Sequence, residues 1–512
     1  MKLRELLEGI DYKLVSGEAG LDRESVGVTD DSRECGLNYA YVCVCGKKND
    51  GHKFVANAVE SGATALICES GRGEEIRGIT ASKGDIAVVE VQDTRSALAR
   101  MLGVLNGVFR SSAKIVCVTG TNGKTTVSTL IYRALCSLGH KAALLGTLGG
   151  EFMGKHYSCG TMTTPDPKIL YGILGEFIKG GAEYIIMEAS SHALALRKLD
   201  GLMVHIGVFT NLTPEHLDFH GSMGEYARAK ARLFERCEYG GVFFADDSYA
   251  ENMQLALACG RRCVRCSITE KSADYFADNV EILGLSGVKY TVIHGDFDRI
   301  GVAVNTRTEV YSGIPGSFSV CNSLLAFSVL CELGIPSVCA SGGVAACRGV
   351  RGRMERLPVP ESAGYSVFID FAHTPDALSK VITAVRDFSK VGERIVLVFG
   401  CGGDRDRSKR SLMGAIASRL ADLTVITADN SRSEATESII EEILSGFDRS
   451  RPYKVITDRR EAINYVLETA GAGDIILLCG KGHEEYEISG GTVQHFSERE
   501  IVAEFFADHG KV

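Results

Sequence analysis

A short apolar strand that runs into a glycine-rich turn constrains the fold of this chain more than any other feature. The stretch reads Lys114-Ile-Val-Cys-Val-Thr-Gly-Thr-Asn-Gly-Lys-Thr-Thr126. Gly120 and Gly123 allow backbone N–H groups to close around an anion, and Lys124 adds a positive charge suited to β- and γ-phosphates. The pattern therefore predicts a strand, a phosphate-binding turn and a helix, in that order.

The residues after the lysine extend this interpretation to a nucleotide. Thr125 or Thr126 can reach a Mg²⁺ ion bound between phosphates, so we expect ATP as the ligand. The usual pattern G-x-x-x-x-G-K-[ST] has glycine where this chain has Val118. The match is therefore to a variant loop, and the alternative is a left-handed turn that binds nothing.

Length and charge narrow the class of protein. A chain of 512 residues exceeds the roughly 250–300 at which single cores stop growing, so we expect about three domains. A net charge of −9 without a Lys/Arg cluster argues against a nucleic-acid partner. No segment approaches the roughly 18 apolar residues of a membrane span, and the N-terminus has no apolar signal region. We therefore expect a cytosolic monomer without membrane insertion.

The cysteines are interpreted as reduced core residues. Most of the 17 are scattered through apolar runs, where cysteine acts as a small hydrophobic side chain. One Cys-x-x-Cys pair, Cys263 and Cys266, has no second pair at zinc spacing and no nearby histidine. The sequence thus favours neither a disulfide framework nor a zinc site.

The hydrophobic pattern predicts an α/β protein with three domains. A small α/β unit is expected over residues 1–100, because short apolar runs there alternate with polar loops. Residues 101–340 alternate strands and helices around the phosphate loop, which indicates a mostly parallel sheet, with an antiparallel flap over about 277–310. Residues 341–512 repeat the α/β alternation.

Polar motifs follow four predicted strands in the last third. They begin at Asp370, Gly400, Asp429 and Gly480, each at the point where an apolar run ends. In open α/β sheets ligands bind at the carboxyl ends of the strands. These four loops therefore predict a substrate pocket at one edge of the sheet.

Two further motifs are candidates for a metal site. Glu188 ends an apolar run, where a carboxylate is costly unless it meets a cation, and Mg²⁺ is the natural one. Downstream, Asn211, His216, Asp218 and His220 follow another predicted strand. His216 alone would be a packed structural histidine more often than a ligand, but beside the phosphate loop and Glu188 it is a candidate second ligand.

Lys230 lies on a predicted helix. By composition it would be a solvated surface lysine, since lysine is rarely buried. The residues themselves give no reason to assign it a function.

Several ordered motifs together resemble those of the Mur ligases. They are Thr119-Gly-Thr-Asn-Gly-Lys-Thr-Thr126, Met187-Glu-Ala-Ser-Ser-His192, Asn211-Leu-Thr-Pro-Glu-His-Leu-Asp218, Gly352-Arg-Met-Glu355 and Asp370-Phe-Ala-His-Thr-Pro-Asp376. The resemblance implies a nucleotide-sugar-binding N-terminal domain, a central ATPase domain and a Rossmann-like C-terminal domain that binds an amino acid. Within the family, the chain resembles the enzymes that add the third residue of the peptidoglycan stem peptide.

The resemblance also implies a reaction. ATP phosphorylates the free D-glutamate carboxyl of UDP-N-acetylmuramoyl-L-alanyl-D-glutamate, and the amine of a diamino acid attacks the acyl phosphate to give an amide. A carboxylate is a poor electrophile until phosphate makes its oxygen a leaving group, so the protein positions groups and neutralises charge. Both organic substrates are small molecules.

Carried over by position, the family pattern assigns roles to individual residues. To ATP it gives Gly120, Thr121, Asn122, Gly123, Lys124, Thr125, Thr126, Asn322, Arg353 and Asp370. To the UDP-muramoyl dipeptide it gives Ser32, Thr163, Thr164, Ser190 and Lys198. To magnesium it gives Thr125, Glu188, His216 and Lys230, the last matching a lysine that the family carbamylates with CO₂. Lys124, Glu188, His216 and Lys230 would act in catalysis.

The choice of amino acid follows from one more motif. Family members that use meso-diaminopimelate carry Asp-Asn-Pro-Arg, whose arginine pairs with the distal carboxylate that lysine lacks. This chain has Asp429-Asn430-Ser431-Arg432, which keeps the arginine and loses the proline. Arg405, Gly480 and Glu484 match the remaining positions, with Glu484 suited to the distal ammonium group. We therefore expect meso-diaminopimelate rather than L-lysine.

Other functions remain as alternatives. A folylpolyglutamate synthase shares the phosphate loop and the acyl-phosphate route but would lack the N-terminal Asp31-Ser-Arg33 motif and Asp429-Asn-Ser-Arg432. A P-loop switch or motor ATPase would hydrolyse ATP without an amino-acid acceptor. An inactive binding module would not need Lys124, Glu188 and His216 together.

Overall fold

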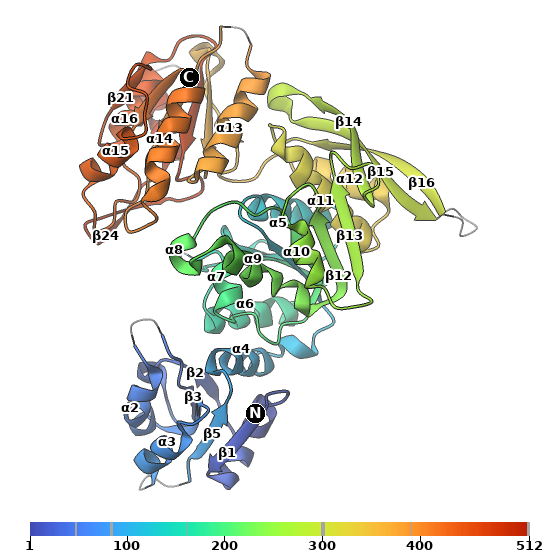
Figure 1. Cartoon of the computed structure of the whole chain (residues 1–512), viewed down its shortest axis with the longest axis vertical. Coiled ribbons are helices and arrows are strands. Elements are labelled where there is room, and N and C mark those ends of the chain that lie inside the picture. Colours follow the sequence, from blue (N-terminus) through green and yellow to red (C-terminus); the bar gives the residue numbers. More distant parts are fainter. Residues whose placement is uncertain (47–48, 82–84, 161, 298–302, 391, 509–512) are drawn as a thin grey trace.

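The computed structural model describes residues 1–46, 49–81, 85–160, 162–297, 303–390 and 392–508. Figure 1 shows three α/β bodies that follow one another along the long axis, coloured blue, green to yellow, and orange to red. Each body has its own main sheet, as the predicted three-domain α/β class requires. No helix among the described residues is long and apolar enough to cross a bilayer.

The N-terminal domain is a five-stranded sheet with helices on both faces. Its strands, in sheet order, are β1 (Tyr12–Ser16), β5 (Ala87–Val91), β4 (Ala63–Glu69), β3 (Tyr39–Val42) and β2 (Gly27–Thr29). Its helices are α1 (Leu3–Leu6), α2 (Val55–Glu60), α3 (Gly73–Thr80) and α4 (Thr94–Leu105). In β5, Val88 faces the cluster under α2 and α3, while Val89 faces α4. Strand β1 is antiparallel to β5, and the other neighbouring strands are parallel to each other. Helices cover both faces, as is usual for a mostly parallel sheet.

The central domain is built on an eleven-stranded sheet. In sheet order the strands are β16 (Ala303–Ser312), β15 (Val288–Phe297), β14 (Tyr275–Ile282), β13 (Arg262–Ser267), β12 (Cys237–Phe244), β11 (Val204–Phe209), β6 (Lys114–Thr119), β10 (Tyr184–Glu188), β7 (Ala142–Gly146), β8 (Gly149–Phe152) and β9 (Lys155–Tyr157). The helices are α5 (Lys124–Ser137), α6 (Pro167–Lys179), α7 (Ser191–Ala195), α8 (Leu217–His220), α9 (Met223–Ala231), α10 (Ala250–Leu255), α11 (Phe318–Glu332) and α12 (Ser337–Ala346).

Strand β6 lies at the centre of this sheet, between β10 and β11, and is parallel to both. Three carboxyl ends therefore meet beside the phosphate loop. The antiparallel flap is present as β14, β15 and β16, although residues 298–302 of its predicted range lie outside the described residues. Strand β13 was not predicted, because its apolar residues alternate with arginines in a short run.

The C-terminal domain is a six-stranded sheet with a separate hairpin. In sheet order the strands are β17 (Glu355–Arg356), β18 (Ser366–Asp370), β22 (Ile475–Cys479), β19 (Ile395–Phe399), β20 (Leu423–Ile426) and β21 (Tyr453–Val455); the hairpin is β23 (Tyr486–Ser489) and β24 (Thr492–His495). The helices are α13 (Pro375–Phe388), α14 (Ser408–Leu420), α15 (Thr436–Leu444), α16 (Arg459–Thr469) and α17 (Glu498–Asp508). All strands of the main sheet except β17 are parallel, so the four polar loops leave the same edge.

The predicted domain boundaries fall inside helices. Residue 100 lies in α4 and residue 340 lies in α12. Helix α12 packs with Ala340 and Val344 in the apolar cluster that also contains α5, so it is part of the central core. The exact boundaries stay predictions.

A fully buried ion pair joins two helices of the C-terminal domain. Arg459, at the start of α16, lies 2.7 Å from the carboxylate of Glu498 on α17, and neither side chain is exposed. The guanidinium also donates to the carbonyls of Ala428, at 3.0 Å, and Cys479, at 2.8 Å. These carbonyls immediately precede two of the predicted substrate loops.

We expect Arg459→Met to lower the free energy of unfolding of this domain by about 3–5 kcal/mol, because Glu498 would keep a buried charge without a partner. The matched control is Arg460→Met, whose pair with Glu504 is half exposed and contributes less than about 1 kcal/mol. Urea denaturation followed by circular dichroism measures both. Equal losses in the two variants would contradict the prediction.

Candidate active site

The phosphate loop connects β6 to α5 as predicted. Its glycines are required by close contacts: a Cβ on Gly120 would lie 1.9 Å from Oγ1 of Thr210, and one on Gly123 would lie 2.5 Å from Oδ1 of Asn322. Both glycines have positive φ, +146° and +87°, which side chains disfavour. The loop is thus folded tightly against the segment after β11 and against α11, where Asn322 lies as expected beside the loop.

The side chain of Lys124 folds back onto the loop that precedes it. Its Nζ donates to the carbonyls of Gly120, at 2.9 Å, and Thr121, at 2.8 Å. Burial lowers the pKa of this amine, and the carboxylates of Glu215 and Glu188 counteract part of that effect. The amine of Lys124 is therefore held at the loop by two backbone carbonyls.

Glu188 is the last residue of β10 and is 2% exposed. Its carboxylate accepts hydrogen bonds from the hydroxyl of Thr125, at 3.0 Å, and from the amide and hydroxyl of Thr147, at 2.8 and 3.0 Å. Among the described residues, no Lys, Arg or His side chain forms an ion pair with it. A buried carboxylate that faces hydroxyl groups rather than a cation is suited to a bound metal ion.

His216 immediately precedes α8 and has a left-handed backbone, with φ +55°. Its Nε2 lies 3.7 Å from the carboxylate of Glu215. Burial lowers the pKa of His216 to about 4, although Glu215 opposes the shift. The imidazole is therefore neutral at pH 7, which leaves a ring nitrogen able to act as a ligand.

Lys230 is buried, so the interpretation as a solvated surface lysine is wrong. Its side chain is 1% exposed, and its Nζ donates to the carbonyl of Gly120 at 2.7 Å and lies 4.6 Å from the ring centre of Tyr226. Tertiary packing is the cause, because the face of α9 that carries Lys230 packs against the phosphate loop and is not exposed to solvent. Burial and the neighbouring Lys124 lower the pKa of this amine well below its ordinary value.

The central and C-terminal domains share one cavity of about 1070 Å³. It brings together most of the residues predicted for nucleotide and amino acid: Thr121, Asn122, Gly123, Lys124, Thr125, Thr126, Asn322, Arg353, Asp370, Arg405, Asp429, Asn430, Arg432, Gly480 and Glu484, together with Glu188, His216 and Thr163. Other predicted residues do not line it: Gly120, Ser32, Thr164, Ser190, Lys198, Lys230 and Ser431.

Polar contacts join the two domains beside the phosphate loop. Arg353 donates to Oγ1 of Thr125 at 3.1 Å, and Asn122 donates to the carboxylate of Asp376 at 2.9 Å. Asp370 accepts from the amides of Met354 and Ala372, at 2.7 and 2.8 Å. The residues predicted to lie near the nucleotide therefore come from both domains.

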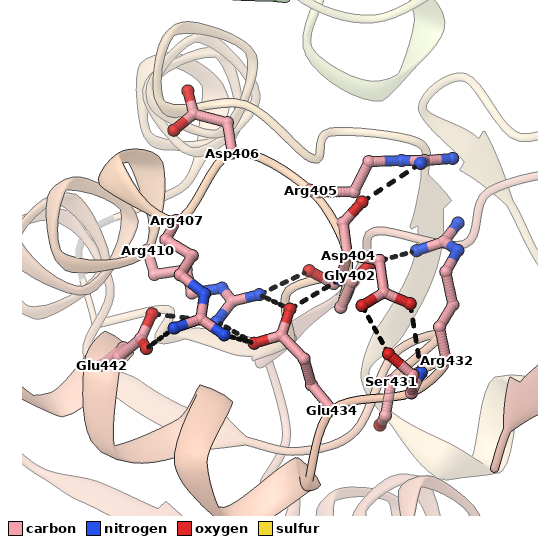
Figure 2. A network of polar contacts seen from close by, with 12 residues as sticks. Gly402, Asp404, Arg405, Asp406, Arg407, Arg410, Ser431, Arg432, Glu434 and Glu442 are labelled. Atoms are coloured by element: carbon pink, nitrogen blue, oxygen red, sulfur yellow. Dashed lines mark hydrogen bonds and ion pairs between the residues drawn. The ribbon is translucent and has the colours of Figure 1, made fainter. Parts of the chain in front are cut away.

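Two of the predicted amino-acid residues, Asn430 and Glu484, line the same cavity and are hydrogen-bonded to each other. Asn430 donates to the carboxylate of Glu484 at 2.7 Å and accepts from Lys481 at 3.2 Å. Burial raises the pKa of Glu484, and the nearby Asp429 adds to the shift. Figure 2 shows the guanidinium groups of Arg405 and Arg432 extending on the same side of their two loops.

The residues predicted for the muramoyl dipeptide lie next to Glu188 or farther towards the N-terminal domain. Thr164 donates to the carbonyl of Glu188 at 2.9 Å and accepts from the amide of Ser190 at 3.0 Å. Lys198 pairs with Asp166 at 2.7 Å. Ser32 lies in a short 3₁₀ turn, Ser32–Glu34, of the N-terminal domain.

Sequence reasoning missed a contact between Glu215 and His373. Glu215 Oε1 lies 3.2 Å from Nε2 of His373, which joins the central and C-terminal domains at the cavity. Although burial opposes it, the hydrogen bond with His373 holds the pKa of Glu215 below its ordinary range. The sequence signals were the position of each residue shortly after a strand end and its place within one of the quoted family motifs.

A second group of potential metal ligands lies in the N-terminal domain. Among the described residues, Cys45, Asp50 and His52 are the group of three whose ligand atoms come within 4.8 Å of one another. Both ring nitrogens of His52 are engaged, Nδ1 with Asp50 at 2.6 Å and Nε2 with the amide of Glu69 at 3.2 Å. The group is therefore explained as a local hydrogen-bonded turn.

We expect Gly123→Ala to weaken MgATP binding at least about tenfold, because the added methyl group displaces Asn322 from the phosphate loop. Gly139→Ala is the matched control: Gly139 has φ +88°, almost the same as Gly123, but open space around its Cβ position. Titration calorimetry compares the two. Equal affinities for both variants would mean that the tight contact is irrelevant to nucleotide binding.

Three family models match the chain in succession. They are "Mur ligase family, catalytic domain" over residues 25–105, "Mur ligase middle domain" over 118–330 and "Mur ligase, glutamate ligase domain" over 352–482. A relative from Clostridioides difficile (strain 630), named UDP-N-acetylmuramoyl-L-alanyl-D-glutamate–2,6-diaminopimelate ligase, is 35% identical over 98% of this chain and 99% of its own length.

Solved structures give the same result. A structure of a UDP-N-acetylmuramoyl-L-alanyl-D-glutamate–2,6-diaminopimelate ligase matches with a TM-score of 0.67 and 29% identity, covering 97% of this chain and all of that one. The MurF ligase from Thermotoga maritima, solved in complex with ADP, shares the fold with a TM-score of 0.59 and 18% identity, covering 94% of this chain and 97% of that one. From the order of its domains, its phosphate loop and its full-length relatives, the chain belongs to the Mur ligase family of ATP-dependent ligases.

Proposed function

We propose that this protein joins meso-diaminopimelate to UDP-N-acetylmuramoyl-L-alanyl-D-glutamate, at the cost of ATP, in the synthesis of a peptidoglycan precursor. The observation that carries the proposal is one cavity lined both by the phosphate loop and by Arg405, Arg432 and Glu484. The names of full-length relatives support the same substrates. The second candidate is the same ligation with L-lysine.

The proposed reaction has two steps. An oxygen of the free D-glutamate carboxylate attacks the γ-phosphorus of ATP, ADP leaves and an acyl phosphate forms. The amine of the amino acid then attacks the acyl carbon and loses a proton, and the tetrahedral intermediate expels inorganic phosphate to leave an amide. Because the first step places negative groups together, the protein mainly has to align them and neutralise their charge.

Cationic and amide groups of both domains carry out this alignment. We assign the phosphates to Lys124 and the backbone amides of residues 120–126. Arg353 lies 3.1 Å from the Thr125 hydroxyl, so its charge reaches the same place from the C-terminal domain. Asn322 and Asp370 line the cavity beside these groups and are assigned to the nucleotide.

The residues near Glu188 fit magnesium. The donor set there consists of a buried carboxylate and the hydroxyl of Thr125, which are the hard oxygen ligands that Mg²⁺ prefers. We assign Thr125 and Glu188 to one such ion, and the neutral imidazole of His216 with the side chain of Lys230 to further metal binding. A bound Mg²⁺ would neutralise charge on the phosphate oxygens.

Carbamylation would make Lys230 a ligand. A neutral amine is the form that adds to CO₂, and burial together with the neighbouring Lys124 lowers the pKa of Lys230, which favours that form. The product is an anionic carbamate, which would attract the protonated amine of the neighbouring Lys124. The burial of Lys230 against the carbonyl of Gly120 thus supports this modification.

We assign the UDP-muramoyl dipeptide to a path from the N-terminal domain to Glu188. Thr163, Thr164 and Ser190 lie around Glu188, close to where the acyl phosphate would form. Lys198 supplies a buried ammonium group for the anionic dipeptide. Ser32 is assigned to the UDP-sugar end, on a turn whose Glu34 pairs with Lys168 of α6 at 2.5 Å.

The acceptor is distinguished by its second carboxylate. Lysine and meso-diaminopimelate share a distal ammonium group, but only the latter carries a carboxylate beside it. Arg432 presents a fork of N–H donors that matches a carboxylate, and Glu484 presents a carboxylate for the ammonium group. We assign Asp429, Asn430, Ser431 and Gly480 to the loops that hold these two side chains.

One assay tests the proposal. The purified protein is incubated with ATP, Mg²⁺ and the UDP-muramoyl dipeptide, and phosphate release is measured without amino acid, with meso-diaminopimelate and with L-lysine. We expect release that depends on both the dipeptide and meso-diaminopimelate, and that stops when Mg²⁺ is chelated. Release that is independent of every amino acid would reject the ligase assignment, and a preference for lysine would favour the second candidate.

Arg432→Ala should lower kcat/KM for meso-diaminopimelate about 100-fold or more, because the distal carboxylate would be bound without its charge partner. Arg432→Lys should restore little, since an ammonium group cannot donate two parallel hydrogen bonds. KM for ATP serves as the internal control and should not change. Steady-state kinetics that gave the alanine variant wild-type kcat/KM would contradict this role.

The raised pKa of Glu484 predicts a pH dependence of acceptor binding. The carboxylate, not the acid, binds an ammonium group, so binding is complete above this pKa and is lost as the pH falls through it. Because burial raises the pKa, the loss begins at a higher pH than for an exposed glutamate. KM for meso-diaminopimelate should therefore rise on acidification, and Glu484→Gln should have a high KM that is flat with pH. An identical pH profile in both proteins would exclude Glu484 as the titrating group.

A further inference from the structure

We propose that the ion pair between Arg410 and Glu434 is a positioning device that fixes the separation of Arg405 and Arg432, and thereby sets the preference for an acceptor with a distal carboxylate. The inference rests on the proposed function, because it concerns the acceptor assigned there. Neither Arg410 nor Glu434 lines the cavity, so both would act through other residues. Figure 2 shows the pair to the left of Gly402 and Asp404, whereas the side chains of Arg405 and Arg432 extend on the right.

Arg405 and Arg432 belong to different loops. Arg405 follows β19, in the loop from residue 400 to 407, and Arg432 follows β20, in the loop from residue 427 to 435. The sheet ladder between these strands ends at Phe399 and Ile426, so it does not fix the loops to each other. Their separation has to be set by contacts beyond the sheet.

Arg410 contacts both loops from the first turn of α14. Its side chain is completely buried, and its Nη2 donates to the carbonyl of Gly402 in the first loop at 3.1 Å. Nη2 and Nη1 together donate to the two carboxylate oxygens of Glu434 in the second loop, at 2.9 and 3.0 Å. A two-pronged contact of this kind fixes orientation as well as distance.

Glu434 also forms a hydrogen bond with the first loop. Its Oε1 also accepts from the backbone amide of Asp404 at 2.6 Å, one residue before Arg405. Asp404 in turn accepts from the hydroxyl of Ser433 at 2.7 Å. Arg405 has an exposed side chain, whose hydrogen bond is to the carbonyl of Asp404 at 3.3 Å, so its location depends on where Asp404 is held.

Arg432 is attached to the same assembly. Its Nη1 donates to the carbonyl of Gly403 at 2.8 Å, and the amide of Gly403 donates to the carbonyl of Asn430 at 2.9 Å. Two guanidinium groups of like charge repel each other, so nearby loops that carry them separate unless other contacts hold them. The anionic Glu434, held by buried Arg410, supplies that contact on the side away from the cavity.

The test uses two variants and one matched control in the full-length protein. Arg410→Lys keeps the positive charge but loses the pair of parallel hydrogen bonds to Glu434. Glu434→Gln keeps the size of the side chain but loses its negative charge. Arg407→Ala is the control, because Arg407 also pairs with Glu434, at 2.8 Å, but is 64% exposed, and the carbonyl of Gly402 accepts from Arg410 instead. For each protein, kcat and KM are measured for meso-diaminopimelate, L-lysine and ATP, and folding is checked by circular dichroism.

We expect KM for meso-diaminopimelate to rise at least about tenfold in both variants, with kcat and KM for ATP within about twofold of wild type. The kcat/KM ratio of meso-diaminopimelate to L-lysine should fall at least about tenfold, whereas Arg407→Ala should keep the wild-type ratio. An unchanged ratio in folded Arg410→Lys and Glu434→Gln overturns the inference, as does an equal fall in Arg407→Ala. If Arg410→Lys does not fold, Glu434→Gln decides. A wild-type enzyme without preference for meso-diaminopimelate would instead reject the acceptor assignment itself.

Discussion

The arrangement around the phosphate loop depends on one buried carboxylate, Glu188. Its oxygens are satisfied by hydroxyl and amide donors, Thr125 and Thr147, rather than by a cationic side chain. A Cβ on Gly146 would lie 2.3 Å from this carboxylate, so the end of the neighbouring strand has to be glycine. The hydroxyl of Thr125 connects the carboxylate to Arg353. The backbone carbonyl of Glu188 accepts a hydrogen bond from Thr164. The same group therefore ties the nucleotide end of the site to the segment assigned to the sugar peptide.

Features that depend on local chain geometry could be predicted from the sequence. The glycines at 120 and 123 have the close contacts and positive φ that the turn pattern implied. The strand ending at Asp370 and the loops beginning at Gly400, Asp429 and Gly480 share one edge, because parallel strands bring their carboxyl ends together. The assignment of single residues to substrates stays a prediction.

Features that depend on how helices and domains pack could not be predicted in this way. Lys230 is polar and lies on a helix with an exposed-looking pattern, but the helix packs that face on the phosphate loop. Glu215 and His373 are separated by 158 residues and meet only because two domains adjoin. The buried arginines 410 and 459 likewise look like surface residues in a sequence, since their burial depends on carboxylates that come from distant segments.

Helix α4 has a consequence for how the protein can move. Its residues belong to a single apolar cluster that includes both the N-terminal sheet and, through α6, the central domain (Figure 1). The C-terminal domain has two clusters of its own and meets the central domain with Phe318 and with polar contacts that water can replace. Rotation at the second junction would break fewer apolar contacts than rotation at the first, so we expect the third domain to move more readily than the other two move relative to each other.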